Sequence, residues 1–293
     1  MSPTVKAGRR EVPVSSPDRV VFDGAGLTKL DLARYYADVA DAMVPHVRDR
    51  PLALHTFPKG VSGEGYFAKN EPRHFPDWIA TVDVPKREGG TIRQVLANDA
   101  PTLVYLAGQN AIALHVWTSR ADRLERPDRL IFDLDPAPDV PFEAVKRAAQ
   151  DLRRRLKRKG LESMLKCTGG KGLHVTVPLA SKEKWPEVKS FAAVVANEMV
   201  ETAPETYVAT MTKTKRKGKI FVDYFRNDYT ATAIADYAVR ARPGAPVALP
   251  LEWKELRTLK SASQFTMKDV LKRLARKGPP APSAQGGHRI PSA

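Results

Sequence analysis

The amino-acid sequence predicts an α+β fold whose C-terminal half has the element order β-α-β-β-α-β. Segments with alternating apolar residues are typical of strands buried on one face, and apolar residues every three or four positions are typical of helices. The alternating segments span 129–135, 161–167, 172–178 and 219–225, and the helical ones lie near 141–159 and 184–202. In this split βαβ order the first strand lies in the middle of the sheet, between the third and the fourth.

The first of these strands, Arg129–Pro136, carries two acidic residues on one face. Its apolar residues alternate with Asp133 and Asp135, so both carboxylates point to the same side, and Pro136 ends the strand. Two carboxylates at this spacing repel each other unless a cation neutralises them, and carboxylate oxygens suit hard divalent metals. The pattern indicates either a divalent-metal site or, equally, a strand end with two solvated acids.

Side-chain alternation on the third and fourth strands places more polar groups beside these acids. His174 on the third strand and Asp223 on the fourth are expected to share the face of Asp133 and Asp135. Three carboxylates on one face do not fit a solvated strand end. They predict two metal ions about 3.5–4 Å apart that clamp a phosphoryl group.

Two segments near the acids have the composition of phosphate-binding loops. Thr168–His174 contains three glycines, whose backbone N–H groups can approach an anion, together with Lys171. Lys213–Lys219 is a basic run that directly precedes the strand of Asp223. Each segment also has a plain interpretation, because glycine pairs are common in hairpin turns and charge runs are usually solvated.

The N-terminal half predicts shorter elements. We expect a strand at 19–22, a helix capped by Thr28 and Asp31, strands at 51–57 and 111–117, and two short helices within 91–110. Tyr66 and Phe67 lie between a glycine-rich loop and Lys69, which indicates either a base-stacking surface or two core aromatics. A lone strand histidine such as His115 is more often structural than catalytic.

Composition narrows the class of protein. The formal net charge of +15 predicts polyanionic partners. Cys167 is the only cysteine, which excludes disulfides and multi-cysteine zinc sites and fits a reducing cytosol. We find no apolar run of membrane-spanning length and no signal peptide, so we expect a soluble cytoplasmic protein, associated with the nucleoid.

Four motifs, in this order, resemble the polymerase domain of bacterial ligase D, a member of the archaeo-eukaryotic primase superfamily. The motifs are Leu-Ile-Phe-Asp-Leu-Asp-Pro at 130–136, Thr-Gly-Gly-Lys-Gly-Leu-His-Val at 168–175, Lys-Arg-Lys-Gly at 215–218 with Asp223-Tyr224, and Val-Arg-Ala-Arg-Pro-Gly-Ala-Pro at 239–246. The resemblance implies a primase-like fold, with an RRM-like catalytic half packed on an N-terminal α/β half. No ligase or nuclease segment adjoins the motifs, so we expect a stand-alone relative.

The domain organisation expected from composition and resemblance has one globular part between two tails. A single primase-polymerase domain is expected over 18–277, with an N-terminal half at 18–127 and a catalytic half at 128–277. Residues 1–17 hold three prolines and are expected to form a flexible arm. Residues 278–293 are rich in Pro, Ala, Ser and Gly and are expected to be a disordered tail.

The resemblance also implies roles for particular residues. The catalytic and metal-binding carboxylates are Asp133, Asp135 and Asp223. The nucleotide-binding residues are His115, Thr168, Gly169, Lys171, His174, Arg216 and Arg240. The DNA-binding residues are Arg19 and Lys29, which match bases that hold the 5′-phosphate at a gap, the template-contacting aromatics Tyr66 and Phe67, and Lys69.

The activity implied is that of a nucleotidyltransferase of the DNA-directed polymerase and primase type. It adds nucleotides, with ribonucleotides preferred, at DNA gaps or broken ends during repair by non-homologous end joining. The implied cofactors are two divalent metal ions, Mn²⁺ by preference or Mg²⁺. The implied partners are gapped or broken DNA with a 5′-phosphate, nucleoside triphosphates, Ku and a separate DNA ligase; we expect a monomer that binds no membrane.

Three positions depart from the family pattern. His55-Thr56 stands where the family usually has Lys-Arg, Thr168 replaces a serine, and Tyr66 is the first of the two aromatics.

Two other functions stay open. One is a non-catalytic DNA-binding module of the same fold. The other is an Asp-x-Asp phosphatase, which Pro136 after the second aspartate and the position far from the N-terminus disfavour.

Overall fold

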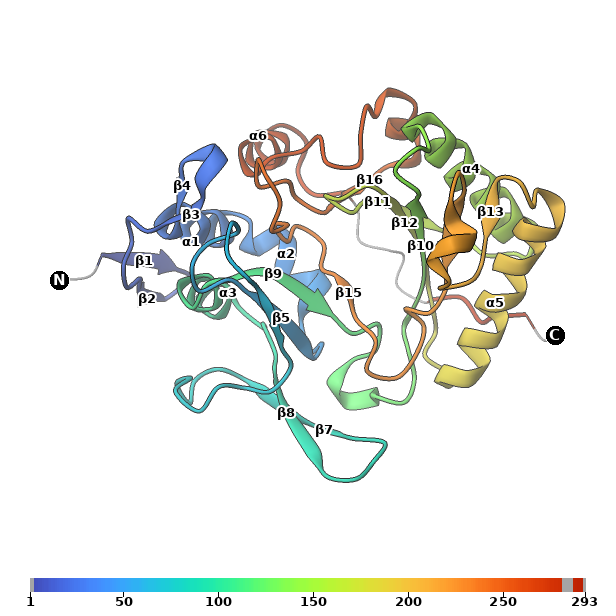
Figure 1. Cartoon of the computed structure of the whole chain (residues 1–293). Coiled ribbons are helices and arrows are strands. Elements are labelled where there is room, and N and C mark those ends of the chain that lie inside the picture. The colour runs from blue at the N-terminus through green and yellow to red at the C-terminus, as the bar shows by residue number, and fades with distance from the viewer. Residues whose placement is uncertain (1–2, 281–286, 292–293) are drawn as a thin grey trace. The chain divides into compact units, whose positions relative to one another are not determined.

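The computed structural model of this protein describes residues 3–280 and 287–291 and separates into two units (Figure 1). Unit 1 comprises residues 1–117, 232–248 and 265–279, and unit 2 comprises residues 118–231, 249–264 and 280–293. The observed fold is of the predicted mixed α+β class.

Unit 2 is built on a six-stranded sheet in the order β13-β14-β10-β12-β11-β16. The strands are β10 (Arg129–Pro136), β11 (Met164–Cys167), β12 (Leu173–Pro178), β13 (Tyr207–Val208), β14 (Ile220–Asp223) and β16 (Leu249–Leu251). β10 lies between β12 and β14 and is antiparallel to both, so the split βαβ order predicted from the sequence is confirmed.

Two long helices of unit 2, α4 (Phe142–Arg158) and α5 (Trp185–Thr202), pack on the sheet. Apolar residues at helical spacing on α4, such as Val145, Leu152 and Leu156, are fully buried. They lie with the fully buried apolar residues of the central strands, such as Phe132 and Val175. Because side chains alternate along a strand, the polar residues of the same strands must use the other face. Short 3₁₀ turns lie at Ala121–Arg123, Lys213–Arg216 and Trp253–Thr258.

Gly172 allows β10 and β12 to approach closely where the acids lie. A Cβ atom at this position would lie 2.1 Å from the backbone oxygen of Leu134, a distance that real contacts do not reach. Any side chain here would push the two strands apart, so the glycine is required by the packing of the backbone.

Unit 1 contains a four-stranded sheet in the order β15-β9-β5-β6 and three two-stranded sheets. Its strands are β1 (Thr4–Ala7), β2 (Arg10–Pro13), β3 (Val20–Phe22), β4 (Leu27–Thr28), β5 (Leu52–Thr56), β6 (Tyr66–Ala68), β7 (Thr81–Pro85), β8 (Thr91–Val95), β9 (Ala111–Val116) and β15 (Ala233–Ile234). Its helices are α1 (Lys29–Asp38), α2 (Ala40–Val47), α3 (Ala100–Gly108) and α6 (Met267–Lys277), with a 3₁₀ turn at Asp23–Ala25.

The start of α1 is set by a capping box, as the sequence predicts. The Thr28 hydroxyl accepts a hydrogen bond from the Asp31 backbone N–H, and the Asp31 carboxylate accepts from the Thr28 backbone N–H. These two bonds satisfy N–H groups that the first turn of a helix otherwise leaves without partners. The helix buries Leu32, Tyr35 and Tyr36.

The structure corrects three expectations at the level of elements. Within the expected flexible arm 1–17, Thr4–Ala7 and Arg10–Pro13 form a hairpin that buries Val5 and Val12. Within 91–110, the first expected helix is strand β8, because it pairs with β7, and only α3 is helical. Residues 232–248 and 265–279 belong to unit 1, so the halves 18–127 and 128–277 are not the structural units; β15 pairs with β9.

Part of the expected disordered tail is ordered. Residues 281–286 and 292–293 lie outside the described residues, but the backbone N–H of His288 donates to the carbonyl of Pro178 at 2.8 Å. The carbonyl of His288 accepts from the N–H of Ala180 at 2.9 Å, so residues 287–291 run beside the end of β12.

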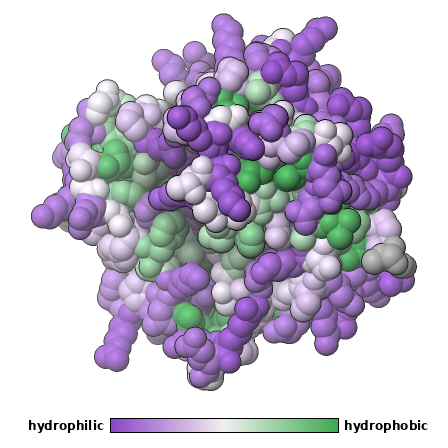
Figure 2. Space-filling model, turned by 45° about the vertical axis from the view of Figure 1, so that its right-hand side comes forward, coloured by the Kyte–Doolittle hydropathy of each residue, from purple (hydrophilic) through white to green (hydrophobic). Residues whose placement is uncertain are grey.

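Hydrophilic side chains cover most of the molecular face seen in Figure 2. Over residues 3–280 and 287–291, no helix is both long enough and apolar enough to cross a membrane.

Candidate active site

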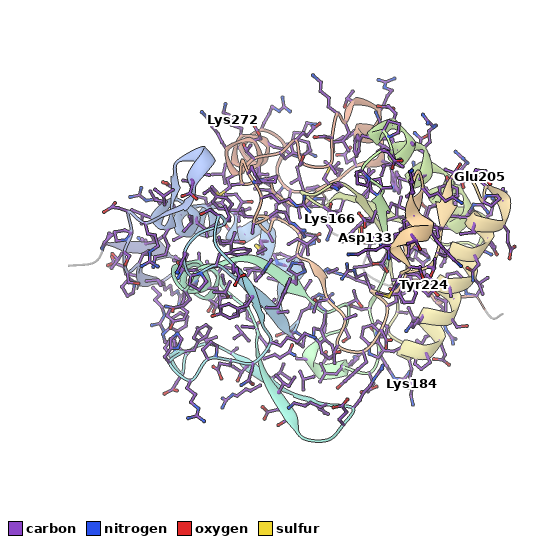
Figure 3. All side chains as sticks on the ribbon, in the orientation of Figure 1. Asp133, Lys166, Lys184, Glu205, Tyr224 and Lys272 are labelled. Carbon is purple, nitrogen blue, oxygen red and sulfur yellow. The ribbon has the colours of Figure 1, made fainter. Side chains whose placement is uncertain are left out.

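The three acidic residues predicted to act together share one face of the unit 2 sheet. Figure 3 labels one of them, Asp133 on β10. Asp133 on β10 is the register partner of Asp223 on β14, and on its other side it is the partner of His174 on β12. Asp135 lies two residues along β10 and therefore points to the same face. This register confirms the side-chain alternation predicted for the three strands.

The surroundings of Asp135 and Asp223 raise the pKa of each carboxyl above its ordinary value. The pKa of Asp135 is raised, first by burial and then by the charge of Asp133, although nearby basic residues oppose both effects. The pKa of Asp223 is raised by burial; Arg226 lowers it, and Asp133 raises it further. Acids in this state gain stability from an added cation, so the chemistry of the three side chains fits a metal-binding role.

Arg226 is the counter-ion of two of these acids in the structure. Its Nε lies 3.4 Å from Oδ2 of Asp223, and its Nη2 lies 3.9 Å from Oδ2 of Asp133. As the side chains stand, no group of three or more His, Cys, Asp or Glu residues within the described ranges is arranged to hold a metal ion. A cation bound to both carboxylates would compete with Arg226 for them.

His174 is a buried partner of Asp133. Its side chain is 3% exposed, and Nε2 lies 3.5 Å from Oδ2 of Asp133. Burial lowers the pKa of His174, while Asp133 acts to raise it. Nδ1 is buried without a hydrogen-bond partner, which is unusual for a polar atom.

The glycine-rich loop before β12 is shaped by its own hydrogen bonds. The Thr168 hydroxyl donates to the carbonyl of Gly172 at 2.8 Å and accepts from the N–H of Gly170 at 3.2 Å. Gly169 has φ +66°, a conformation that favours glycine, and its N–H donates to the carbonyl of Ala262. Thr168 is buried, so its hydroxyl shapes the loop, and Lys171 is the exposed side chain of the segment.

A basic pocket of about 570 Å³ adjoins Asp135. It is lined by Asp135, Pro136, Ala137, Pro138, Asp139, Lys171, Lys213, Arg216 and Lys217. Arg216 Nη1 lies 3.9 Å from Oδ2 of Asp135, and its guanidinium stacks 3.7 Å above the Phe221 ring. The Asp139 carboxylate accepts a hydrogen bond from the N–H of Gly218, which holds the basic loop against the end of β10. Four cations beside one acid of the cluster form an anion-binding surface.

Sequence reasoning missed three residues of this site. Besides Arg226, it missed Lys166 on β11, which is the register partner of His174 and is 7% exposed. It also missed Asn227, which is fully buried. The Asn227 amide accepts from the N–H of Ile131 and donates to the carbonyls of Ile131 and Tyr224, so it ties the turn after Asp223 to β10. The only available signal was the position of these residues close to predicted site residues.

In unit 1, the structure brings together Phe67 on β6 and His115 on β9. It also places a third ring, His55, on the intervening strand β5. The Phe67 ring meets His115 edge-on at 5.2 Å and stacks on His55 at 4.1 Å. Tyr66 and Phe67 are 54% and 51% exposed, which excludes the core interpretation of this pair. Lys69 is also exposed, and Arg240 lies close enough to His55 to lower the pKa of its imidazole.

Arg19 and Lys29 are adjacent but differ in exposure. The N–H of Lys29 donates to the carbonyl of Arg19 at 2.8 Å. Arg19 is exposed, and its guanidinium donates to the carbonyl of Pro58. Lys29 is 2% exposed, and its ammonium donates to Ser15 Oγ at 3.2 Å and to the carbonyl of Gly108 at 3.1 Å. Burial, and then Arg19, lowers the pKa of Lys29. Lys29 is thus an internal tie in unit 1, and Arg19 is the solvent-facing base of the two.

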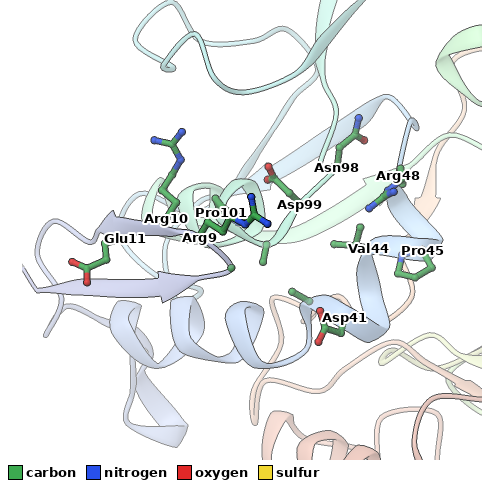
Figure 4. Close-up of a pocket in the computed structure, with 13 residues that line it drawn as sticks. Arg9, Arg10, Glu11, Asp41, Val44, Pro45, Arg48, Asn98, Asp99 and Pro101 are labelled. Atoms are coloured by element: carbon green, nitrogen blue, oxygen red, sulfur yellow. The ribbon is translucent and has the colours of Figure 1, made fainter.

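A larger concavity of about 890 Å³ lies in unit 1 between the β1–β2 turn and the start of α3 (Figure 4). Its charged residues are Arg9, Arg10, Glu11, Asp41, Arg48 and Asp99. Acids and bases balance there, and none of the residues that the sequence predicts for the site lines it, so size alone does not locate the chemistry.

A helix-backed mixed sheet with clustered carboxylates beside a basic pocket is typical of a primase-polymerase domain. The chain belongs to the family described as "LigD, primase-polymerase domain", whose profile matches residues 28–281. The sequence-based recognition of this family is thereby confirmed.

Named relatives and a solved structure agree with this assignment. The chain is 36% identical over 269 residues to the "Multifunctional non-homologous end joining protein LigD" of Pseudomonas aeruginosa, covering 92% of the chain and 32% of that protein. It is 28% identical over 267 residues to the "Bifunctional non-homologous end joining protein LigD" of Bacillus subtilis, covering 91% and 43%. The chain therefore spans about a third of the length of the first relative and less than half of the length of the second.

The solved structure is the "Polymerase Domain from Mycobacterium tuberculosis Ligase D in complex with DNA". It matches with a TM-score of 0.85 and 32% identity, covering 92% of this chain and 96% of that one. The predicted fold is confirmed by this match.

Proposed function

We propose that this chain is a template-directed nucleotidyltransferase that adds nucleotides, with ribonucleotides preferred, at DNA gaps or broken ends in non-homologous end joining. One observation carries the proposal: Asp133 and Asp223 are register partners, with Asp135 on the same face beside a basic pocket. Carboxylates next to anion-binding cations are the arrangement that phosphoryl transfer from a triphosphate requires.

Asp133, Asp135 and Asp223 are the residues that would hold two divalent ions, Mn²⁺ by preference or Mg²⁺. Such ions supply Lewis acidity that activates a primer 3′-hydroxyl and stabilises the leaving pyrophosphate. The raised pKa values of Asp135 and Asp223 support this role, because a cation favours their ionised form.

The other residues of the site bind and orient. His174 holds the Asp133 carboxylate through Nε2. Lys171 and Arg216 neutralise the phosphates of the incoming nucleotide in the basic pocket. Thr168 and Gly169 shape the loop that presents Lys171. His115 and Arg240 of unit 1 are also proposed as nucleotide-binding residues.

The DNA side of the proposal rests on unit 1. The exposed rings of Tyr66 and Phe67 stack on template bases, and Lys69 contacts the DNA backbone. Arg19 binds a 5′-phosphate at the far side of a gap, and Lys29 supports it from within. The name of the solved relative, a domain in complex with DNA, supports a nucleic-acid partner. Ku and a separate ligase are proposed as repair partners.

A primer-extension assay tests the function. The purified chain is incubated with a gapped duplex, labelled nucleoside triphosphates and Mn²⁺, and extended primers are resolved on a gel. Template-matched addition, faster with ribonucleotides, supports the proposal. DNA binding without extension would identify a non-catalytic module, and phosphate release without a primer would identify a phosphatase.

A further inference from the structure

Four rings form a row on one face of the unit 1 sheet. We call Phe57, His55, Phe67 and His115 the ring row. Centroid distances are 4.4 Å from Phe57 to His55, 4.1 Å from His55 to Phe67 and 5.2 Å from Phe67 to His115. Strand register produces the row, because His55 is the partner of Phe67 across β5–β6 and Ala53 is the partner of His115 across β5–β9.

The ring row passes from buried to exposed. Phe57 is 7% exposed, and a Cβ on Gly65 would lie 2.4 Å from its ring, so the Gly65 backbone closes that end. Phe67 is 51% exposed although two other rings contact it. An exposed ring held in place on one side gives a ligand a rigid flat surface, which lowers the entropy cost of stacking.

His55 is the central ring of the row. Its plane lies 11° from that of Phe67, whereas it is tilted by 52° to Phe57. Burial, and secondly the charge of Arg240, lowers the pKa of His55, which favours the uncharged imidazole. A lysine at this position would not form a parallel ring stack, because its flexible ammonium carries no ring.

We propose that His55 is a positioning residue that holds the Phe67 ring for stacking against an unpaired base of a DNA template strand. The inference rests on the proposed function for its ligand. His55 does not touch the base; it backs the ring that does.

The first test measures base stacking directly. A gapped duplex carries 2-aminopurine as the first unpaired template base, and binding is followed by its fluorescence quenching. Phe67→Ala should weaken binding at least about fivefold and abolish most of the quenching, since one base-aromatic stack is lost. His55→Ala should weaken binding in the same direction by a smaller factor.

The double variant separates positioning from an independent contact. If His55 acts through Phe67, His55→Ala/Phe67→Ala should bind no more weakly than Phe67→Ala alone. Losses that simply multiply would overturn the proposal, and so would wild-type quenching in His55→Ala. The matched control is His74→Ala, because His74 is an exposed histidine that meets the Phe75 ring at 5.2 Å outside the ring row; it should bind and quench as wild type does.

Two replacements distinguish stacking from charge. His55→Phe should restore binding and quenching, because it keeps a ring parallel to Phe67, and it continues the test if His55→Ala does not fold. His55→Lys should lower quenching and steepen the plot of log K against log salt by about 0.9, since one more cation meets a phosphate. Failure of His55→Phe to restore quenching would refute a stacking role.

These measurements need no nucleotide addition. A protein that stacks the base but does not extend primers would leave the ring row proposal standing and refute the proposed function. A protein that extends primers without any quenching of the unpaired base would support the proposed function and refute the ring row proposal.

Discussion

The sheets of the two units use the same strand alternation but place different chemistry on the face that their apolar residues leave free. In unit 2 that face holds Asp133, Asp223 and His174 as register partners. In unit 1 the ring row occupies the corresponding face, with His55 and Phe67 as register partners.

The two faces differ in the kind of interaction that links their residues. On the acid face, the ionisation of each carboxylate depends on its neighbours, because Asp133, Arg226 and burial all shift the pKa of Asp223. On the ring face, packing acts only where rings touch, because dispersion and stacking fall off within a few ångströms, and the charge of Arg240 additionally shifts the pKa of His55. Substitutions on the acid face should therefore alter chemistry and cation binding. Substitutions on the ring face should alter local contacts.

The largest expected effect is the loss of nucleotide addition on removing an acid. Asp133→Asn and Asp223→Asn should each slow primer extension at least about a thousandfold, because metal-assisted charge stabilisation is lost. Affinity for gapped DNA, measured by fluorescence anisotropy, should stay within about twofold, since basic residues supply it. Extension at the wild-type rate in either variant would contradict the metal role.

The second largest effect concerns the turn behind the acid face. Asn227→Ala removes two buried hydrogen bonds and one part-buried one, and it leaves the N–H and carbonyl of Ile131 unsatisfied. We expect a loss of about 2–4 kcal/mol in the free energy of unfolding, measured by urea denaturation. Asn98→Ala in unit 1 is the control, because its side chain is paired with half-buried Asp49, and its loss should be smaller. Equal decreases in the free energy of unfolding for Asn227→Ala and Asn98→Ala would contradict a particular contribution of the Asn227 turn to stability.

Removing the Arg226 bridge should strengthen cation binding. Arg226 is 44% exposed, so its contacts with Asp133 and Asp223 are screened and modest in strength. Arg226→Ala should bind Mn²⁺ about three- to tenfold more tightly, measured by the loss of the free-ion signal in electron paramagnetic resonance. Arg120→Ala is the matched control, because Arg120 is 39% exposed and pairs with Asp128 instead. Unchanged or weaker Mn²⁺ binding in Arg226→Ala would refute the competition.

A smaller effect is expected at the 5′-phosphate. Gapped DNA with a 5′-phosphate should bind about three- to tenfold more tightly than the 5′-hydroxyl form, and Arg19→Ala should reduce that ratio. Lys29→Ala should mainly lower stability, because its buried ammonium holds Ser15 and Gly108. Titrations of both DNAs with both variants provide the measurement. Equal wild-type affinity for the two DNAs would exclude a 5′-phosphate site.

The smallest effect is a pH dependence on the ring face. Because the folded-state pKa of His55 is lowered, its contribution to stability is present above the unfolded-state pKa and is lost as pH falls through the folded-state pKa. The groups that face it are Phe57, Phe67, His115 and the charge of Arg240. His55→Phe should therefore lose less thermal stability than wild type between pH 7.5 and the acid side of the normal histidine pKa. Equal changes of melting temperature with pH in His55→Phe and wild type would refute a contribution of His55 to the pH dependence of stability.

The sequence by itself determined the sheet of unit 2 and its acid face. Period-two alternation at 129–135 and the split βαβ order were enough to place Asp133 next to Asp223 and His174, because register in a half-buried sheet follows the apolar pattern. The same local rules predicted the capping box of α1, since its two hydrogen bonds involve residues three apart.

Only the tertiary structure decided which side chains face each other across the elements. Arg226, Asn227 and His55 acquire their roles from partners on other strands, and neither local propensity nor periodicity encodes such distant contacts. Burial decided the role of Lys29. A lysine in a first helical turn is usually solvated, but here its ammonium reaches the carbonyl of Gly108 at the end of α3. Long-range packing also determined the N-terminal hairpin: β1 and β2 pair locally, but they contact α1 and α3, and Val5 and Val12 are buried.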